Sequence, residues 1–259
     1  MKLINRFLLL SLIAVLSLTS CEDESINSTA LLGLEFYPVE EGRSWTYQVD
    51  SLIIFREGNN RIESTSFIRE NITGSFVNGS GDTTYILTIS ESETLEGTFR
   101  IKDTWSIEKS RSSVIRYEEN LGFLKLTFPL TECAQPNIID CDEIDNILFD
   151  QQLKLDLPQF SIQPYTFWGY RVLNRGRALT VGGMDFINVT TIQQADNQLE
   201  FTNDLNQRKV IEQYAPNVGL IQRTMEIFNT DCGTECRDQP WEEKADFGFS
   251  LVQTLVAYN

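Results

Sequence analysis

Apolar residues occupy every second position in many short runs of this chain, and this alternation constrains the fold more than any other feature. Between residues 43 and 57 the odd positions hold the apolar set Trp45, Tyr47, Val49, Ile53 and Phe55. Successive side chains of a β-strand point to opposite faces, so a period of two predicts a strand with one buried face. Similar runs follow along the chain, at 62–72, 85–89, 99–107, 124–128, 170–172, 186–192, 210–214, 220–228 and 249–258.

Turn signals separate these runs, as antiparallel hairpins require. The segment 78–82 reads Asn-Gly-Ser-Gly-Asp, and Gly182-Gly183 marks a second turn. No long window carries a convincing helical stripe, and the best candidate, 143–155, fits a short helix or a strand equally well. We therefore expect an all-β, mostly antiparallel protein with about ten to twelve strands. Residues 34–259 are expected to form one β domain with irregular insertions at 129–146 and 230–246.

The first 20 residues have the parts of an export signal. Lys2 and Arg6 precede an uncharged, mostly apolar run over residues 7–18, and small polar residues then lead to a cysteine. At about 12 residues this run is too short to span a bilayer roughly 30 Å thick. The segment Leu18-Thr19-Ser20-Cys21 resembles the lipobox of bacterial lipoproteins. The alternative is an ordinary secretory signal that ends beside a cysteine.

The lipobox resemblance implies cleavage between Ser20 and Cys21 and a lipid on the Cys21 thiol. Residues 21–33 would then be an acidic flexible tether that begins with Glu22, Asp23 and Glu24. Such an acid-rich stretch is similar to the one that directs many Bacteroidota lipoproteins to the outer face of the outer membrane. We expect a lipid-anchored outer-membrane protein, with surface exposure favoured over the periplasmic face. The alternative for the acidic stretch is a solvated linker.

Charge and the lack of histidine exclude several kinds of chemistry. The formal net charge of −16 opposes binding to phosphate backbones, so nucleic acid is not an expected partner. The chain contains no histidine, which removes Ser-His-Asp and Cys-His nucleophile systems and histidine-ligated zinc. No catalytic or phosphate-binding motif is present, and we expect neither an enzyme nor a cofactor.

Four cysteines remain after the proposed anchor: Cys133, Cys141, Cys232 and Cys236. In an exported protein an even number of cysteines indicates disulfides. The local pairs are favoured, Cys133 with Cys141 and Cys232 with Cys236, so that each insertion is stapled by one bridge. A four-thiolate zinc site is the alternative, and its usual knuckle spacing is absent.

Three aspartates next to Cys141 form the densest acidic patch, which makes Asp140, Asp142 and Asp145 weak candidates for calcium ligands. Ile144 stands where a third alternating ligand should be, so a solvated loop is favoured and no metal site is expected.

Two tryptophans are weak candidates for a ligand platform. Trp168 lies in an aromatic cluster, and Trp241 is flanked by carboxylates in the second cysteine-containing insertion. Aromatic rings beside carboxylates are typical of sugar sites, and paired carboxylates suggest a glycan hydrolase. A core or rim position explains most tryptophans better.

Two further segments carry a resemblance. Phe36-Tyr37-Pro38 with Gly42, Trp45 and Tyr47 resembles the opening of a broad group of uncharacterised Bacteroidota outer-membrane lipoproteins. The segment 214–221 is similar to the Tyr-Ala-x-x-Val-Gly-Leu-Val segment near the end of the same proteins. The resemblance implies a strongly curved antiparallel sheet, a half-barrel or barrel-like form, and brings no known activity.

The expected function is therefore a membrane-anchored lipoprotein with a non-enzymatic β domain. Its partner would be an apolar ligand, a glycan or an envelope protein. The alternatives are a structural partner of an outer-membrane complex and, least favoured, a carboxylate-based hydrolase. We also expect Trp45 to be buried as a structural anchor, because it begins the apolar face of the first long run.

Overall fold

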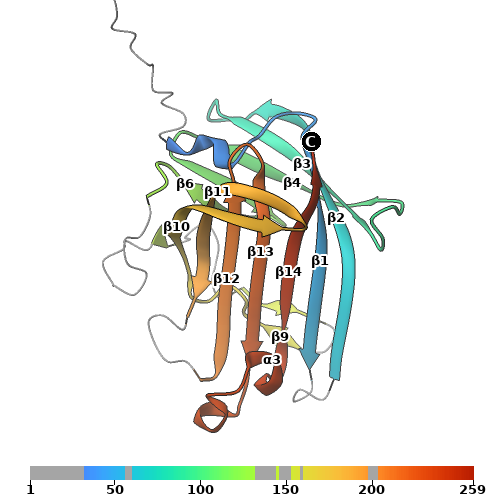
Figure 1. Ribbon diagram of the computed structural model, residues 1–259, viewed down its shortest axis with the longest axis vertical. Coiled ribbons are helices and arrows are strands. Elements are labelled where there is room, and N and C mark those ends of the chain that lie inside the picture. The colour runs from blue at the N-terminus through green and yellow to red at the C-terminus, as the bar shows by residue number, and fades with distance from the viewer. Residues whose placement is uncertain (1–31, 56–59, 132–143, 146–152, 158–159, 198–203) are drawn as a thin grey trace, which may run out of the picture.

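The computed structural model describes residues 32–55, 60–131, 144–145, 153–157, 160–197 and 204–259 (Figure 1). It confirms the all-β prediction. Twelve strands form one antiparallel sheet in the order β6-β5-β4-β3-β2-β1-β14-β13-β12-β11-β10-β7, and β8 pairs with β9 in a small second sheet. The strands are β1 (Ser44–Phe55), β2 (Asn60–Val77), β3 (Thr83–Ser92), β4 (Arg100–Lys109), β5 (Ser113–Glu118), β6 (Leu121–Thr127), β7 (Ile144–Asp145), β8 (Leu155–Asp156), β9 (Ser161–Ile162), β10 (Trp168–Val181), β11 (Met184–Asp196), β12 (Asn206–Ala215), β13 (Gly219–Asn229) and β14 (Phe247–Tyr258).

The large sheet has two arms that meet where β1 pairs with β14. The N-terminal arm, β1 to β6, is a meander of consecutive hairpins, and the C-terminal arm runs from β14 back to β10 and β7. The sheet curls so strongly that the far ends of the two arms approach each other (Figure 1). The Thr127 N–H of β6 donates to the Tyr170 hydroxyl of β10 at 3.1 Å, and Gln194 of β11 donates to the Lys125 carbonyl at 3.4 Å. Side chains thus join the arms where no backbone ladder does, and the barrel is nearly closed.

The odd residues of β1 face the core side of the sheet, as predicted, but only Trp45, Tyr47 and Val49 are buried there, whereas Ile53 and Phe55 are partly exposed. Trp45 is 6% exposed and Tyr47 is 1% exposed, which confirms the prediction that Trp45 is buried. The Trp45 indole N–H donates to the Val218 carbonyl at 2.5 Å, and the Tyr47 hydroxyl donates to the Leu220 carbonyl at 3.0 Å. The two segments that carry the lipoprotein resemblance therefore lie against each other, although more than 170 residues separate them in the chain.

The start of the described chain packs against one end of the barrel. The 3-10 turn η1 (Leu34–Phe36) buries Phe36 completely. The Lys109 ammonium donates to the carbonyls of Leu34 and Tyr37 at 2.8 and 2.7 Å and so holds this turn in place. Gly33, at the end of the expected tether, has φ 83°, and a Cβ there would lie 2.8 Å from Leu130. Close packing of this backbone on the domain therefore requires glycine.

The predicted turns are present. In the hairpin between β2 and β3 the Asn78 N–H donates to the Asp82 carbonyl at 2.8 Å. Gly182 and Gly183 join β10 to β11 with φ of 57° and 78°, values that side chains with a Cβ rarely adopt. The stretch that fitted either a helix or a strand is extended in its described parts, β7 and the start of β8.

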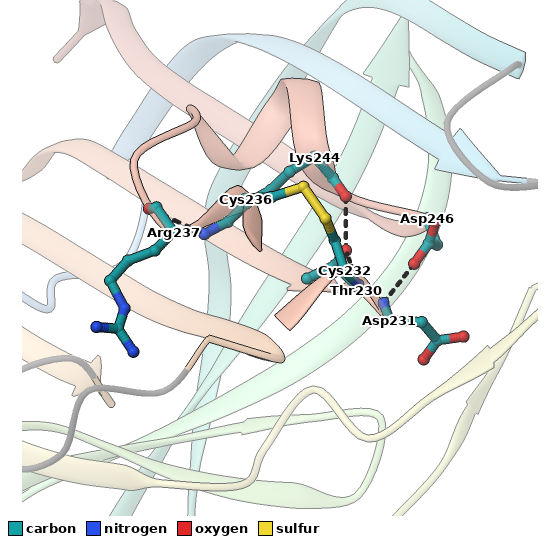
Figure 2. Close-up of a disulfide and its surroundings, with 7 residues drawn as sticks. All are labelled: Thr230, Asp231, Cys232, Cys236, Arg237, Lys244 and Asp246. Carbon is teal, nitrogen blue, oxygen red and sulfur yellow. Dashed lines mark hydrogen bonds between the residues drawn. A yellow bond between two sulfur atoms is a disulfide. The ribbon is translucent and has the colours of Figure 1, made fainter. Parts of the chain in front are cut away.

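The second insertion forms a small module outside the sheet. It contains η2 (Gly233–Cys236) and the short helix α3 (Trp241–Lys244), and Ala245 packs with Ile54 and Phe228. Ile54 has the opposite parity to Tyr47, so the module covers the face of β1 that points away from the core. The Cys232–Cys236 disulfide confirms the predicted local pair (Figure 2). Thr230 donates to the Lys244 carbonyl at 2.7 Å and fastens the base of the module.

Several predictions fall outside the described residues: the signal segment with Ser20, the anchor Cys21, and the residues Cys133, Cys141, Asp140 and Asp142. The backbone of Asp145 belongs to β7, where it pairs with Gly169. In the described part of the chain no helix has the length and apolar character needed to cross a membrane.

Candidate functional site

Six charged side chains meet on the core face of the sheet. We call this set the interior charge cluster: Glu70, Arg116, Glu118, Lys125, Glu212 and Arg223. Both arms contribute, with β2, β5 and β6 from the N-terminal arm and β12 and β13 from the C-terminal arm. Three carboxylates face three cations, so their formal charges cancel. Such a cluster inside a sheet is a candidate site because buried, perturbed ionisable groups often mark function.

Glu212 is the hub on the C-terminal arm. Its side chain is 1% exposed, and its Oε1 accepts from Lys125 Nζ at 3.1 Å and from Arg223 Nε at 2.8 Å. The other oxygen accepts from the Tyr214 hydroxyl at 2.7 Å and from Gln194 Nε2 at 3.1 Å. Four protein donors therefore satisfy this carboxylate, as a buried charge requires.

Glu118 is the hub on the N-terminal arm. Its Oε1 lies 2.7 Å from Arg116 Nε, 3.2 Å from Lys125 Nζ and 3.8 Å from Arg223 Nη2. Arg116 Nη1 also reaches Glu70, at 3.3 Å from each carboxylate oxygen. Lys125 and Arg223 contact both hubs and so join the two arms. Lys125 does so by a charge-assisted hydrogen bond to Glu212, and Arg223 by a longer ion pair with Glu118.

Burial and the neighbouring charges set the ionisation of these carboxyl groups. Burial opposes ionisation of Glu212, but Lys125 and Arg223 outweigh it and lower the pKa of Glu212 to about 2. Burial likewise opposes ionisation of Glu118, and Arg116 and Lys125 nevertheless hold its pKa well below the ordinary value. Burial and the nearby Arg223 lower the pKa of Lys125. Both hub carboxyls therefore carry their full charge near neutral pH.

This ionisation state limits the chemistry of the cluster. Glycoside hydrolysis by two carboxylates needs one group that stays protonated near neutral pH, with a raised pKa, to act as the general acid. Glu118 and Glu212 have the opposite shift, and every one of their short contacts is to a protein donor. The two carboxylates therefore form ion pairs that hold the two arms of the sheet together, and they do not have the ionisation states of a catalytic acid–base pair.

Little free space adjoins the cluster in the described part of the protein. Tyr37, Trp45, Tyr47, Glu70 and Arg116 line a void of about 20 Å³. A void of this size has room for about one water molecule. Aromatic and aliphatic side chains fill the rest of this layer of the core, including Leu87, Ile107 and Leu220.

Neither of the two candidate tryptophans, Trp168 and Trp241, has a fully solvent-exposed ring. Trp168 is 5% exposed, packs against Phe123 and Tyr165, and donates from its indole N–H to the Pro164 carbonyl at 2.9 Å. The weak prediction of a ligand platform at Trp168 is therefore wrong, because the ring is part of a second core cluster. Trp241 is half-buried at the start of α3, with the Lys244 ammonium 4.0 Å from its ring centroid.

Among the described residues no three His, Cys, Asp or Glu side chains are grouped so that they could hold a metal ion. The calcium candidates Asp140 and Asp142 lie outside this part of the chain. The interior charge cluster was missed at the level of sequence, although Lys125 gave a signal. It is a lone cation in the apolar stretch Leu121–Thr127, where a solvent-facing charge would be expected to alternate with polar neighbours.

No protein-family model matches the chain, and no curated protein sequence does so either. Among solved structures, a candidate exported protein with a YmcC-like fold from Bacteroides fragilis is 9% identical, with a TM-score of 0.42, and covers 86% of this chain and 98% of its own. A candidate lipoprotein from Parabacteroides distasonis is 11% identical, with a TM-score of 0.40 and the same coverage. TM-scores this low assign neither a family nor a function. The class that the chain's own geometry defines is a nearly closed antiparallel barrel with a charged, paired interior.

Proposed function

We propose that this chain is an exported protein held at the outer membrane by a lipid on Cys21, and that its β domain binds a ligand without transforming it. The lipobox-like segment that ends in Cys21 supports the anchor, together with the acidic residues that follow it. Two lipid chains hold a protein stably on a membrane, so a diacylglycerol-modified Cys21 needs no transmembrane helix.

One observation carries the binding role: the interior charge cluster is fully ion-paired and the core beside it is packed. The roughly 20 Å³ void next to Glu70 is far below the about 300–1,000 Å³ of a small-molecule site. An apolar carrier needs a deep apolar cavity, and a hydrolase needs a protonated carboxyl group. The described surroundings of the cluster supply neither, which favours recognition at a part of the sheet that is open to solvent.

Membrane fractionation of a Cys21→Ser variant tests the anchor. We expect the parent protein in the outer-membrane fraction and Cys21→Ser in the soluble or secreted fraction. The matched control is the double variant Cys232→Ser/Cys236→Ser, which loses two cysteines but keeps the lipobox and is expected to remain with the membrane. A Cys21→Ser variant that still partitions with the outer membrane would contradict the proposal.

A further inference from the structure

We infer that a groove beside the end of β3, the start of β4 and the middle of β2 binds a neutral oligosaccharide; this inference rests on the proposed binding function and assigns it a site. The β2–β4 groove has a volume of about 620 Å³ and is lined by Ser66, Glu91, Thr94, Arg100, Ile101 and Lys102, among others. This volume lies within the range of about 300–1,000 Å³ that is typical of small-molecule sites.

The strand register shows on which face of the sheet the groove opens. Glu91 lies directly opposite Ile68 and Arg100, and Ile68 lies opposite Tyr47 of the core. Residues paired in an antiparallel ladder share a face, so Glu91 and Arg100 continue the core-facing side of the sheet. The Arg100 side chain is exposed, so this end of the face is open to solvent.

The central carboxylate of the groove is held in place before any ligand arrives. Glu91 Oε1 accepts from the Ser66 hydroxyl at 3.2 Å, and Glu91 Oε2 lies 2.9 Å from Lys102 Nζ. Its side chain is nevertheless 37% exposed, and that of Lys102 is 54% exposed. A carboxylate fixed on one side and open on the other can accept hydrogen bonds from ligand hydroxyls at little conformational cost.

Charge balance selects the class of ligand. The groove combines two carboxylates, Glu91 and Glu93, with two cations, Arg100 and Lys102. It is therefore neutral in a chain whose formal net charge is −16. An anionic ligand would meet carboxylates and the repulsion of the whole protein, and a cation would meet Arg100 and Lys102. The groove therefore offers carboxylate acceptors, cationic donors and the hydroxyls of Ser66 and Thr94. A neutral molecule rich in hydroxyl groups can form hydrogen bonds with all three.

One apolar side chain completes this match. Ile101 is the one apolar side chain among the described residues that line the groove, and it is 75% exposed. A sugar ring has an apolar face of C–H groups as well as hydroxyls at its edge. Ile101 pairs with Ser90 rather than with Glu91, so it borders the groove at the free edge of β4, where it can contact that apolar face while the charged groups meet the hydroxyls.

The edge of β4 beside the groove is not built to add a peptide strand. β5 pairs only with Ser106 to Lys109, so the first part of β4 has a free edge. That edge is blunted, because the Asp103 carboxylate accepts from the Thr104 N–H at 2.7 Å and the ladder to β3 shifts register at Ile89/Ser90. Bulges and charges of this kind prevent strand addition, which favours a ligand bound by side chains.

Calorimetric titration of the full-length protein, purified from membranes in detergent, tests the inference. The probes are three neutral trisaccharides (maltotriose, cellotriose and triacetylchitotriose), with trigalacturonate as the anionic counterpart. We expect at least one neutral probe to bind with a Kd below about 1 mM. The substitution Ile101→Arg fills the groove and should weaken binding at least about tenfold. Ile187→Arg is the matched control, because Ile187 is 77% exposed in β11 and does not line the groove.

The outcomes separate this inference from the function on which it rests. Neutral-sugar binding that Ile101→Arg does not weaken overturns the groove and leaves the binding function standing. Failure of every neutral probe to bind, or tighter binding of trigalacturonate, overturns the assigned ligand class. The fractionation of Cys21→Ser is independent of each of these results.

Discussion

The interior charge cluster and the β2–β4 groove use the same residue types in opposite surroundings. In the cluster, Arg116 and Lys125 are 3% exposed and Glu212 is 1% exposed. In the groove, Glu91 and Lys102 are 37% and 54% exposed. Removing one partner of a buried ion pair leaves an uncompensated charge, whereas a solvated partner is simply rehydrated. Carboxylate–cation pairs thus hold the barrel together in the interior charge cluster, whereas in the β2–β4 groove they remain accessible to a ligand.

The largest expected effect comes from Glu212→Ala, which leaves Lys125 and Arg223 buried without the closer contacts of one of the two carboxylates that they share. We expect a loss of about 3–5 kcal/mol in the free energy of unfolding. Urea denaturation measures it, with Glu91→Ala as the matched control that should cost less than about 1 kcal/mol. Equal losses in the two variants would remove the distinction between the two regions.

Acid should weaken the cluster gradually. The pKa of Glu212 is lowered to about 2 from its ordinary value of 4.5. The folded state therefore binds fewer protons than the unfolded state between these values, so the stability from Glu212 is complete above about pH 4.5 and is lost as the pH falls toward 2. Melting temperatures across this window measure the loss. Glu212→Gln should show a shallower dependence on pH, and a parallel curve would contradict the assignment.

A smaller and local effect is expected in the outer module. The Cys232–Cys236 bridge closes a short loop, for which the chain-entropy model gives about 2 kcal/mol. Cys232→Ser/Cys236→Ser should speed hydrogen exchange at Thr230 to Ala245 while β12 and β13 keep their protection. Global loss of protection in the sheet would show that the module is part of the core.

The smallest effect is expected at the groove. Lys102→Ala removes the cation paired with Glu91 at 2.9 Å, a solvated contact worth about 0–1 kcal/mol. Thermal melts should therefore nearly coincide with those of the parent, while the affinity for a neutral trisaccharide falls. A strong destabilisation would mean that the groove, like the cluster, is structural.

Alternation predicted the strand content and the core-facing side of β1 with Trp45, and the Asn-Gly-Ser-Gly-Asp sequence predicted the hairpin turn at residues 78–82. These features are local, because the backbone geometry of a strand fixes a period of two wherever it forms. The local Cys232–Cys236 pair was predictable for the same reason, since only three residues separate the two cysteines. The aromatic sequence around Trp168 left a ligand platform open beside the favoured core position, because composition alone does not show whether a ring faces solvent or a second core cluster.

Only the tertiary structure decided which charges meet inside the barrel. Lys125 and Glu212 are 87 residues apart, and Glu70 and Arg116 are 46 apart. Their contact depends on the curl of the sheet and on the register of strands that do not follow each other in the chain. Apart from Lys125, each charge by itself looks like a solvent-facing residue. The sequence therefore determined the strands, the turns and the lipobox-like segment, whereas the paired interior and the open, neutral groove arise from long-range pairing that a period of two does not encode.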